Sequence, residues 1–235
     1  MKPLQRKTYD ISQIIMYEDR NILVCHKPAG LPVQTKNLTQ KDLESILKTH
    51  LAPKTDIKEA PYLAVINRLD QPVEGLVLFA KTPKAASNLT KQLTSNQMVK
   101  EYLAITSALP IKSAQTLTDY LVKDGKSNLS KVVNSSVKEA KKAILDYKVV
   151  TNNGKHALLQ IFLKTGRHHQ IRVQMANMGT PLLGDKKYGG KSAENLCLCA
   201  WHLAFQHPIT LENLNFSVQP QNPEFSSYLP IDTTV

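Results

Sequence analysis

Arg68 and Asp70 are separated by one residue and lie between two apolar stretches of the chain, residues 62–66 and 76–80. Side chains alternate along an extended strand, so these two would face the same way and Leu69 would face the core. A carboxylate backed by apolar strands is partly desolvated and needs a cation to stay ionised. The pair is therefore either a structural salt bridge, the commoner meaning of such a pattern, or a carboxylate kept charged for chemistry.

A second concentration of polar side chains follows the break at residues 165–166 and comprises Arg167, His168, His169, Gln170 and Arg172. The pattern predicts a helix over residues 168–179, with its C-terminal cap at Gly179. Cations at a helix N-terminus oppose the macrodipole, whereas exposed N–H groups and guanidinium forks there suit a phosphate or a carboxylate. A basic surface turn is the alternative. No cysteine or carboxylate stands at ligand spacing nearby, so we expect no metal site.

Tyr102 lies in the apolar stretch of residues 99–109, which predicts a strand. A tyrosine in such a strand is, by itself, typical of a core position with a satisfied hydroxyl group. Cys197 and Cys199 would face one way on a later strand, near His202, and this pattern indicates buried thiols rather than a zinc site.

The composition restricts the class of protein. The chain has 235 residues, 42% of them hydrophobic, which is enough for one large domain or two small ones. It has no apolar run of about 18 residues, and residues 1–10 lack the apolar stretch of a signal peptide. Three cysteines without a CxxC pair fit a reducing compartment. The sequence therefore predicts a cytoplasmic protein with no membrane span.

The charge is strongly positive and uneven. The formal net charge is +11, and the first 190 residues carry 29 basic against 15 acidic side chains. Such an excess favours a polyanionic partner, because each neutralised phosphate releases counterions; a lysine-rich surface is the alternative. Only five basic residues are arginines, and Arg68, Arg167 and Arg172 all fall in the polar stretches above. Arginine is needed where a planar fork makes bidentate contacts, so this distribution points to the same stretches.

Alternation, apolar periodicity and turn residues predict the elements that must position these side chains. Strands are expected over residues 21–34 with a break at 28–30, and over 62–67, 76–82, 99–109, 116–133 with a hairpin at 124–125, 141–150, 156–165 and 195–208. Helices are expected over residues 41–51, 83–96 and 168–179. Strands outnumber helices and hairpin turns join most of them, so the pattern predicts an α+β domain with a largely antiparallel mixed sheet and peripheral helices.

Taken together, these stretches resemble the RluA-type RNA pseudouridine synthases. The matching segments lie between residues 22 and 208 and read, in order, LVCHKPAGLPV, NRLDQPVEGLVLFAKT, KEYLA, LKTGRHHQIRVQMANMGTPLLGDKKYG and LCAWHLAFQHP. The combination of R-L-D with G-L-x-x-x-A-K, K-x-Y-L-A, T-G-R-x-H-Q-I-R and G-D-x-x-Y-G is specific. The resemblance implies a central catalytic cleft in which the bond between uracil and ribose of a uridine in ribosomal or transfer RNA is cleaved. The uracil then turns and rejoins through carbon 5, without a metal or redox cofactor.

The resemblance also implies roles for individual residues. Asp70 matches the essential aspartate, which acts on the ribose as nucleophile or as base, and Arg172 matches the arginine that pairs with it. Tyr102 matches the tyrosine that packs against the uracil and is placed to handle the carbon 5 proton. Arg68 matches the arginine that helps to hold the uridine out of its stack. Further substrate contacts are expected from Arg167, His169 and Gln170.

Elementary chemistry agrees with these roles. Breaking a glycosidic bond builds positive charge at the sugar, which an ionised carboxylate stabilises or attacks. A uridine must leave its stack to be reached, and an aromatic face such as that of Tyr102 replaces the lost stacking partner.

The chain departs from the family pattern at a few positions. Asn67 stands where a histidine is common, residues 71–74 replace an acidic and hydroxyl-bearing segment, and Gln174 stands where another histidine is common. We expect a single catalytic domain over residues 1–235, with its core at about 17–210, no separate N-terminal RNA-binding domain, and a monomer. RNA would then be held by lysine-rich segments such as residues 123–148.

Two rival functions remain at this point. A non-catalytic RNA-binding or ribosome-assembly factor could share the fold, but the intact set of Asp70, Tyr102 and Arg172 favours an enzyme. A glycosidase acting on free sugars would need a second carboxylate opposite the first. Glu74 is the only nearby candidate, and the turn is expected to point it outward.

Overall fold

A computed structural model of the chain describes residues 9–229, except residue 38 and residues 55–59. Most of the N-terminal stretch that lacks a signal-peptide pattern thus lies outside the described residues, as do both ends of the expected domain. No helix in the described part of the chain is long and apolar enough to cross a membrane.

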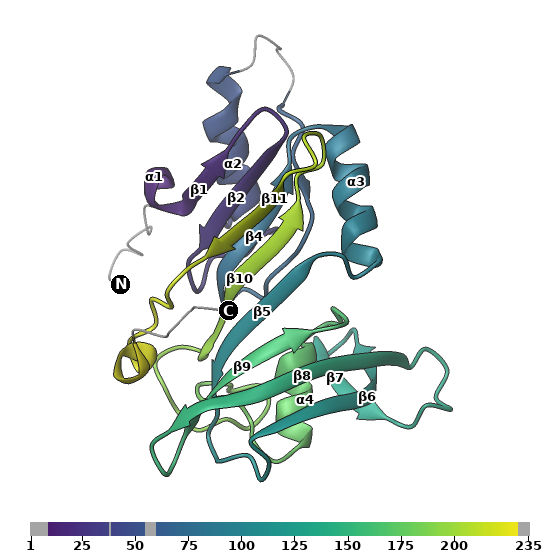
Figure 1. Cartoon of the computed structure of the whole chain (residues 1–235), viewed down its shortest axis with the longest axis vertical. Coiled ribbons are helices and arrows are strands. Elements are labelled where there is room, and N and C mark those ends of the chain that lie inside the picture. Colours follow the sequence, from purple (N-terminus) through teal and green to yellow (C-terminus); the bar gives the residue numbers. More distant parts are fainter. Residues whose placement is uncertain (1–8, 38, 55–59, 230–235) are drawn as a thin grey trace.

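The strands form one sheet in the order β1-β2-β4-β10-β5-β9-β8-β6-β7, with β3 paired to β4 and β11 paired to β10 (Figure 1). Their bounds are β1 Ile15–Glu18, β2 Ile22–Lys27, β3 Ala64–Val65, β4 Glu74–Ala80, β5 Val99–Ile105, β6 Ala114–Asp124, β7 Leu129–Val133, β8 Lys141–Asn152, β9 Ala157–Leu163, β10 Leu198–Gln206 and β11 Asn213–Ser217. Strands β1 and β11 are additions to the elements that the sequence predicts.

The sheet is antiparallel except where β4 runs parallel to β10. The expected α+β fold with a largely antiparallel mixed sheet is therefore confirmed. At the parallel pair, Gly75 lies opposite Ala200 and has a φ of 123°. A Cβ atom at Gly75 would overlap the backbone of Ala200, so only glycine permits this approach. The contact fixes the start of β4, a few residues after Asp70, against the centre of the sheet.

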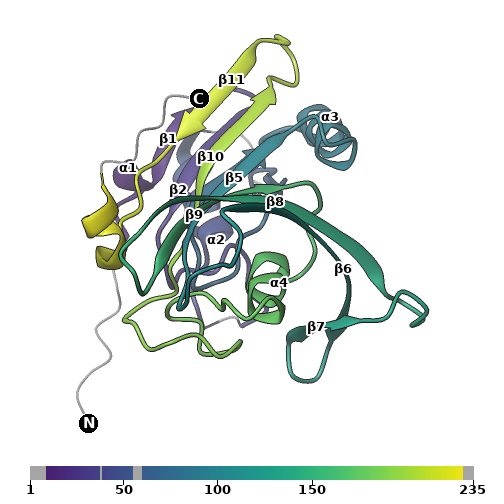
Figure 2. The same ribbon diagram turned by 60° about the horizontal axis from the view of Figure 1, so that its bottom comes forward.

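Helices cover both faces of the sheet. Their bounds are α1 Ile11–Ile14, α2 Leu43–Leu51, α3 Pro83–Thr94 and α4 Gln170–Asn177, with the 3₁₀ turns η1 Ala52–Lys54 and η2 Pro223–Tyr228. Helices α2 and α4 bury their apolar sides in one core, which also contains Tyr102. Helix α3 and η2 pack in a second core on the opposite face, which contains Leu103. Figure 2 shows how β8, β6 and β7 curve around α4.

Local capping explains where the first long helices begin. Asp42 accepts a hydrogen bond from the backbone N–H of Ser45, and the Ser45 side chain reaches back to the N–H of Asp42, which makes a capping box for α2. The Thr82 side chain caps α3 by accepting from the backbone N–H of Ala85, with Pro83 as the first helical residue. Both helices therefore form within the limits that the sequence predicts.

The expected strand over residues 62–67 is shorter in the structure, and the placement of Arg68 and Asp70 on a strand is wrong. Only Ala64–Val65 pair as β3. The Asn67 side chain then takes the place of a backbone partner: it accepts from the N–H of Leu78 at 2.8 Å and donates to the carbonyl of Leu76 at 3.1 Å. Leu69 is buried, as predicted. Asp70 opens a turn in which its carbonyl accepts from the N–H of Val73.

Candidate active site

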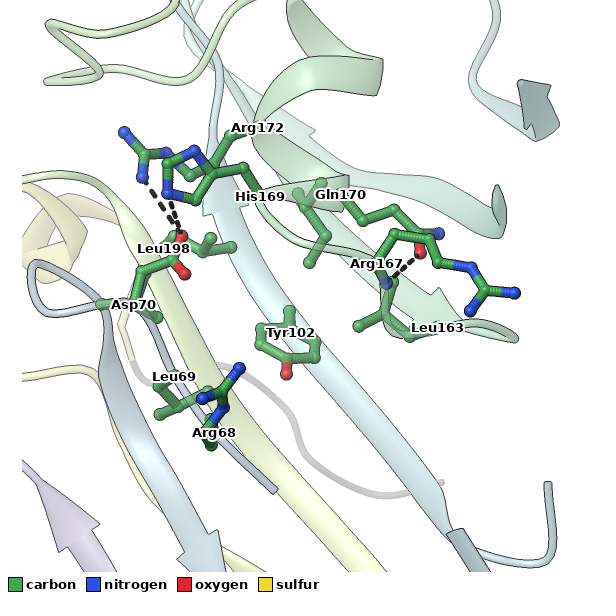
Figure 3. A pocket seen from close by; sticks show the side chains of 12 residues that line it. Arg68, Leu69, Asp70, Tyr102, Leu163, Arg167, His169, Gln170, Arg172 and Leu198 are labelled. Carbon is green, nitrogen blue, oxygen red and sulfur yellow. Dashed lines mark hydrogen bonds and ion pairs between the residues drawn. The ribbon is translucent and has the colours of Figure 1, made fainter. Parts of the chain in front are cut away.

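One pocket brings together all seven residues for which the sequence predicts a functional role. Its walls come from the turn before β4, from β5 and β10, and from the segment that leads into α4 (Figure 3). The lining residues are Arg68, Leu69, Asp70, Val73, Tyr102, Leu163, Arg167, His169, Gln170, Ile171, Arg172 and Leu198. The pocket lies on the sheet face that also carries α2 and α4.

Asp70 is paired with Arg172 and not with Arg68. The Arg172 guanidinium donates from Nη1 to Asp70 Oδ2 at 3.1 Å, and the arginine side chain is 5% exposed against 29% for the aspartate. Arg68 is exposed, and among the described residues its side chain makes no hydrogen bond or ion pair. The interpretation of Arg68 and Asp70 as a structural salt bridge is therefore wrong, and the Arg68 fork is free to face a ligand.

Asp185 is a part of the site that the sequence did not single out. It accepts from Arg172 Nε at 2.8 Å and from Nη2 at 2.7 Å, and its side chain is fully buried. Burial alone would lower the pKa of Arg172, but the hydrogen bonds and charge of Asp185, with a smaller effect of Asp70, raise it. The bidentate pair with Asp185 thus fixes the guanidinium of Arg172 independently of its contact with Asp70. The available signal was the G-D-x-x-Y-G motif.

His169 approaches the same carboxylate oxygen from the other side. It has a φ of 53° and directly precedes α4, which therefore begins at Gln170 and not at His168 as predicted. Its Nε2 atom lies 3.4 Å from Asp70 Oδ2, and its Nδ1 atom lies 2.8 Å from the hydroxyl of Tyr188. Burial lowers the pKa of His169 to about 4, and Asp70 opposes this shift only in part. The imidazole is neutral at neutral pH.

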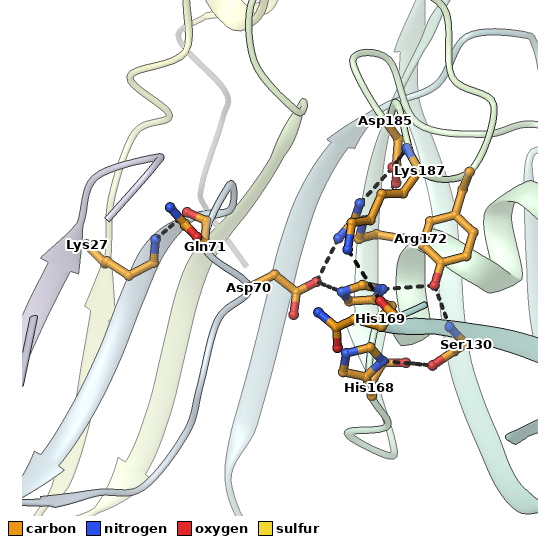
Figure 4. A network of polar contacts seen from close by, with 11 residues as sticks. Lys27, Asp70, Gln71, Ser130, His168, His169, Arg172, Asp185 and Lys187 are labelled. Atoms are coloured by element: carbon orange, nitrogen blue, oxygen red, sulfur yellow. Dashed lines mark hydrogen bonds and ion pairs between the residues drawn. The ribbon is translucent and has the colours of Figure 1, made fainter. Parts of the chain in front are cut away.

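The hydrogen bonds around Tyr188 fix the position of the proton on His169. The backbone N–H of Ser130 can only donate, and it donates to the Tyr188 hydroxyl oxygen at 2.8 Å. The Asp70 carboxylate can only accept and lies 3.4 Å from His169 Nε2, which favours a proton on Nε2 and leaves Nδ1 to accept from the Tyr188 hydroxyl. The neutral ring therefore carries its own proton on Nε2, the nitrogen that faces Asp70. Figure 4 shows this chain from Ser130 to Asp70.

These contacts leave the two oxygens of Asp70 in different states. Oδ2 faces both Arg172 and His169, whereas Oδ1 has no hydrogen-bond partner among the described residues. A carboxylate held by one oxygen keeps its orientation while the other oxygen remains available to a reacting atom.

Arg167 and Gln170 shape the loop in front of α4. Gln170 is buried, and its Oε1 atom accepts from the hydroxyl of Thr165 at 2.8 Å and from the backbone N–H of Arg167 at 2.9 Å. Its amide nitrogen donates to the carbonyl of Ile144 at 3.1 Å. Arg167 is exposed and donates from Nε to the carbonyl of Lys142, which leaves its terminal nitrogens toward solvent.

Tyr102 lies between the two groups of polar side chains (Figure 3). It is 8% exposed, and burial raises the pKa of its phenol, with a smaller effect of the Asp70 charge. The hydroxyl group therefore stays protonated at neutral pH. The ring offers a flat apolar surface beside Asp70.

Lys27 holds the loop that carries Asp70. It is fully buried, and its ammonium donates to the carbonyls of Pro28, Leu31 and Gln71 at 3.0, 2.7 and 3.1 Å (Figure 4). The Gln71 carbonyl also accepts from the N–H of Gly30. These bonds join the turn after β2 to the residue that follows Asp70. Burial lowers the pKa of Lys27 to about 7, although the charges of Asp70 and Glu74 oppose the shift.

The expectation that Glu74 points outward is wrong. Glu74 is 2% exposed, and its two carboxylate oxygens accept from the backbone N–H groups of Gln221 and Asn222 at 3.0 and 3.1 Å. Its carboxylate fixes the segment before η2 and does not line the pocket. The second carboxylate that a glycosidase would need is therefore not supplied by Glu74.

The cysteines are free and buried, as the sequence predicts for Cys197 and Cys199. Burial raises the pKa of Cys197 to about 12 and that of Cys199 well above its ordinary value. Within the described residues, no group of three or more His, Cys, Asp or Glu side chains could hold a metal ion.

Comparison with known proteins defines the class to which this fold and site belong. Residues 21–177 match the family model for RNA pseudouridylate synthase, so the chain belongs to that family, whose members are RNA-modifying isomerases. It is 32% identical over 224 residues to ribosomal large subunit pseudouridine synthase D of Vibrio cholerae, covering 88% of this chain and 67% of the relative. The protein of the same name from Pseudomonas aeruginosa is 36% identical over 182 residues, covering 77% of this chain and 55% of the relative.

A solved structure shows the same fold. Human RNA pseudouridylate synthase domain containing 4 superposes with a TM-score of 0.73 at 24% identity, covering 89% of this chain and 90% of that chain. The family model and the curated relatives confirm the family that the sequence motifs indicate, and the solved structure supports the fold.

Replacing Tyr188 by phenylalanine is expected to slow turnover about tenfold or more, because it removes the donor that fixes the His169 tautomer. Without that donor, the proton of the neutral ring can move to Nδ1, which leaves a bare Nε2 facing Asp70. Nitrogen NMR of labelled histidine would show directly which ring nitrogen carries the proton.

Ser130→Ala is the matched control for that variant. It removes the hydroxyl that contacts His168 but keeps the backbone N–H that donates to Tyr188. We expect turnover within about twofold of wild type and an unchanged tautomer. Equal losses in both variants would show that the contact with the hairpin, and not the proton on His169, sets the rate.

Lys27 gives a prediction for stability against pH. Its folded pKa of about 7 lies below the ordinary value of 10.5 expected for the unfolded chain. Between these values the unfolded state binds the proton and the folded state does not, so stability rises with pH, by at most about 1.4 kcal/mol per unit. Urea unfolding at several pH values should show wild type gaining stability relative to Lys27→Met from pH 7 upward. A constant difference between the two proteins would contradict the assignment.

Proposed function

We propose that this protein converts uridine to pseudouridine in large-subunit ribosomal RNA, with Asp70 as the catalytic group. The observation that carries the proposal is the state of Asp70: one oxygen is held by Arg172 and His169, and the other is free beside the ring of Tyr102. The ribosomal substrate rests on the names of the relatives described above.

The geometry supports a division of labour around the reacting nucleotide. Asp70 Oδ1 acts on the ribose, as nucleophile or as base, while Arg172 holds Oδ2 in place. Tyr102 stacks against the extruded uracil. Because the phenol of Tyr102 is protonated in the resting enzyme, we assign packing and hydrogen-bond donation to this residue. The phenol could accept the carbon 5 proton only after losing its own proton.

The substrate contacts expected from the sequence divide into two groups. Arg68 and Arg167 are exposed at the pocket and present guanidinium nitrogens to a ligand, which supports direct binding. His169 and Gln170 have their ring or amide atoms directed at protein partners. We therefore propose that His169 and Gln170 position Asp70 and the loop, and that the two arginines contact RNA.

The remaining expectations stand as parts of the same proposal. The catalytic domain spans the chain, acts as a monomer in the cytoplasm without a cofactor, and grips RNA with the lysine-rich residues 123–148. Strands β6 and β7, whose hairpin lies within this segment, curve around α4 beside the site (Figure 2), which supports that grip.

Tritium release tests the proposed activity. RNA carrying tritium at carbon 5 of uridine loses it to water when pseudouridine forms. The purified full chain would be incubated separately with unmodified large-subunit ribosomal RNA and with unmodified transfer RNA. We expect release from the ribosomal RNA. Tritium release from transfer RNA alone would contradict the proposed ribosomal substrate. RNA binding without tritium release from either RNA would favour a non-catalytic RNA-binding factor.

A further inference from the structure

Lys100 is a cation at the site that neither the fold nor the proposed chemistry uses. It lies on β5, two residues before Tyr102, so both side chains project from the same face of the sheet. It lines a cleft of about 500 Å³ that includes Asp70 and Tyr102 and extends past them. The Cα atoms of Lys100 and Tyr102 are about 7 Å apart along the strand, so the lysine lies beside a group that stacks on the tyrosine.

The Lys100 ammonium has no acceptor. Among the described residues, none forms a hydrogen bond or ion pair with its Nζ atom. The adjacent carboxylate, Glu101, projects from the opposite face of β5, where it accepts from Gln160 at 2.6 Å and pairs with His202. Among the described residues that line the cleft, Asp70 alone carries a carboxylate, and its Oδ2 atom is held by Arg172 and His169.

Burial makes this isolation unfavourable for the free protein. Lys100 is half-buried, and desolvation lowers its pKa with no opposing charge. An ammonium that loses water without gaining an acceptor destabilises the folded state, whereas an apolar side chain of similar length would pack there without that penalty. An anion in the cleft would supply the acceptor that the ammonium lacks.

The surroundings of Lys100 define the anion. Arg68 and Arg167 line the same cleft, so two guanidinium groups add to the positive charge of Lys100 there. Gly166 faces the ammonium without a side chain, and a methyl group there would lie 4.0 Å from Lys100 Nζ. The space beside Nζ is therefore open, next to a backbone loop and within reach of guanidinium groups, as an oxyanion requires.

We propose that Lys100 binds a backbone phosphate of the RNA next to the nucleotide that stacks on Tyr102. This inference rests on the proposed function for the identity of the polyanion. It assigns to Lys100 a binding role at the cost of stability in the free protein. Substitution of Lys100 should therefore weaken RNA binding and keep or raise the stability of the free protein. A purely structural lysine would show a loss of stability instead.

The test compares Lys100→Gln and Lys100→Met with wild type in the full chain. Dissociation constants for unmodified large-subunit ribosomal RNA would be measured over a range of potassium chloride concentrations. We expect weakening of about tenfold at low salt, and a slope of log Kd against log salt that is smaller by about one phosphate contact. The melting temperature of Lys100→Met should equal or exceed that of wild type.

Lys155→Gln is the charge-matched control. Lys155 is exposed in the turn between β8 and β9, at the opposite end of β9 from Leu163, which lines the cleft. We expect this variant to keep the wild-type salt slope. Excess inorganic phosphate should weaken RNA binding by wild type more than binding by Lys100→Gln, whose site is already lost.

Three outcomes would overturn the inference: an unchanged salt slope in Lys100→Gln, an equal change in Lys155→Gln, or a lower melting temperature in Lys100→Met. The proposed activity fails separately. If wild type releases no tritium from any RNA while Lys100→Gln still loses one contact, the phosphate site stands and the catalytic assignment does not.

Discussion

Asp70→Asn is expected to abolish turnover, with a loss of at least about a thousandfold in tritium release. Asparagine keeps the shape of the side chain but offers no carboxylate oxygen to attack or deprotonate the sugar. It still presents a carbonyl oxygen to Arg172, which is anchored independently by Asp185. The fold and the RNA affinity should therefore be close to those of wild type.

The comparison requires binding and activity to be measured on the same RNA. Wild-type affinity with release abolished would support Asp70 as the catalytic group. Turnover of Asp70→Asn near the wild-type rate would remove Asp70 from the mechanism, whatever the family membership of the chain.

Arg172→Ala is expected to be the most destabilising single substitution at the site. Asp185 has no exposed side-chain surface and would lose both of its bonds to the guanidinium, and Asp70 would lose its Nη1 donor. Removing one partner of a buried ion pair typically lowers the free energy of unfolding by about 3–5 kcal/mol. Denaturant unfolding should show that loss, and turnover should fall with it.

Arg167→Ala is the control for that loss. Arg167 is exposed and makes one side-chain hydrogen bond, to the carbonyl of Lys142. We expect its unfolding free energy to stay within about 1 kcal/mol of wild type, with weaker RNA binding. If Arg172→Ala were as stable as Arg167→Ala, Asp185 would not depend on the guanidinium for its burial.

Local patterns account for most of the fold, whereas the seven residues that meet in the pocket were assigned through the motifs that carry the family resemblance. The hairpin at residues 124–125, the start of the helix at Pro83 and the apolar stretch around Tyr102 each depend on a few neighbouring residues, so the sequence displays them directly. The predicted strand before Asp70 is too long. The Asn67 side chain, and not its backbone, makes the hydrogen bonds to β4, and an apolar pattern does not reveal this.

Contacts between distant segments could not be predicted in the same way. Asp185 and Tyr188 lie in a loop, and Ser130 lies on β7; they act at the site only because the sheet curves around α4. A buried acceptor such as Glu74 is equally hidden, since its partners are backbone groups at residues 221–222. Edge strands β1 and β11 are short and carry exposed or half-buried positions, so their alternation is weak.

The bidentate bond between Arg172 and Asp185 has a consequence for the course of the reaction. Asp70 loses its negative charge when it bonds to the sugar or takes up a proton. The guanidinium would then be an uncompensated cation in a dry site, if Asp70 were its sole counter-ion. Because Asp185 already pairs with Arg172, the two side chains together remain electroneutral at that stage. The guanidinium therefore needs no new counter-ion and can keep its position. The scaffold can therefore stay rigid while the charge on a single carboxylate rises and falls through each catalytic cycle.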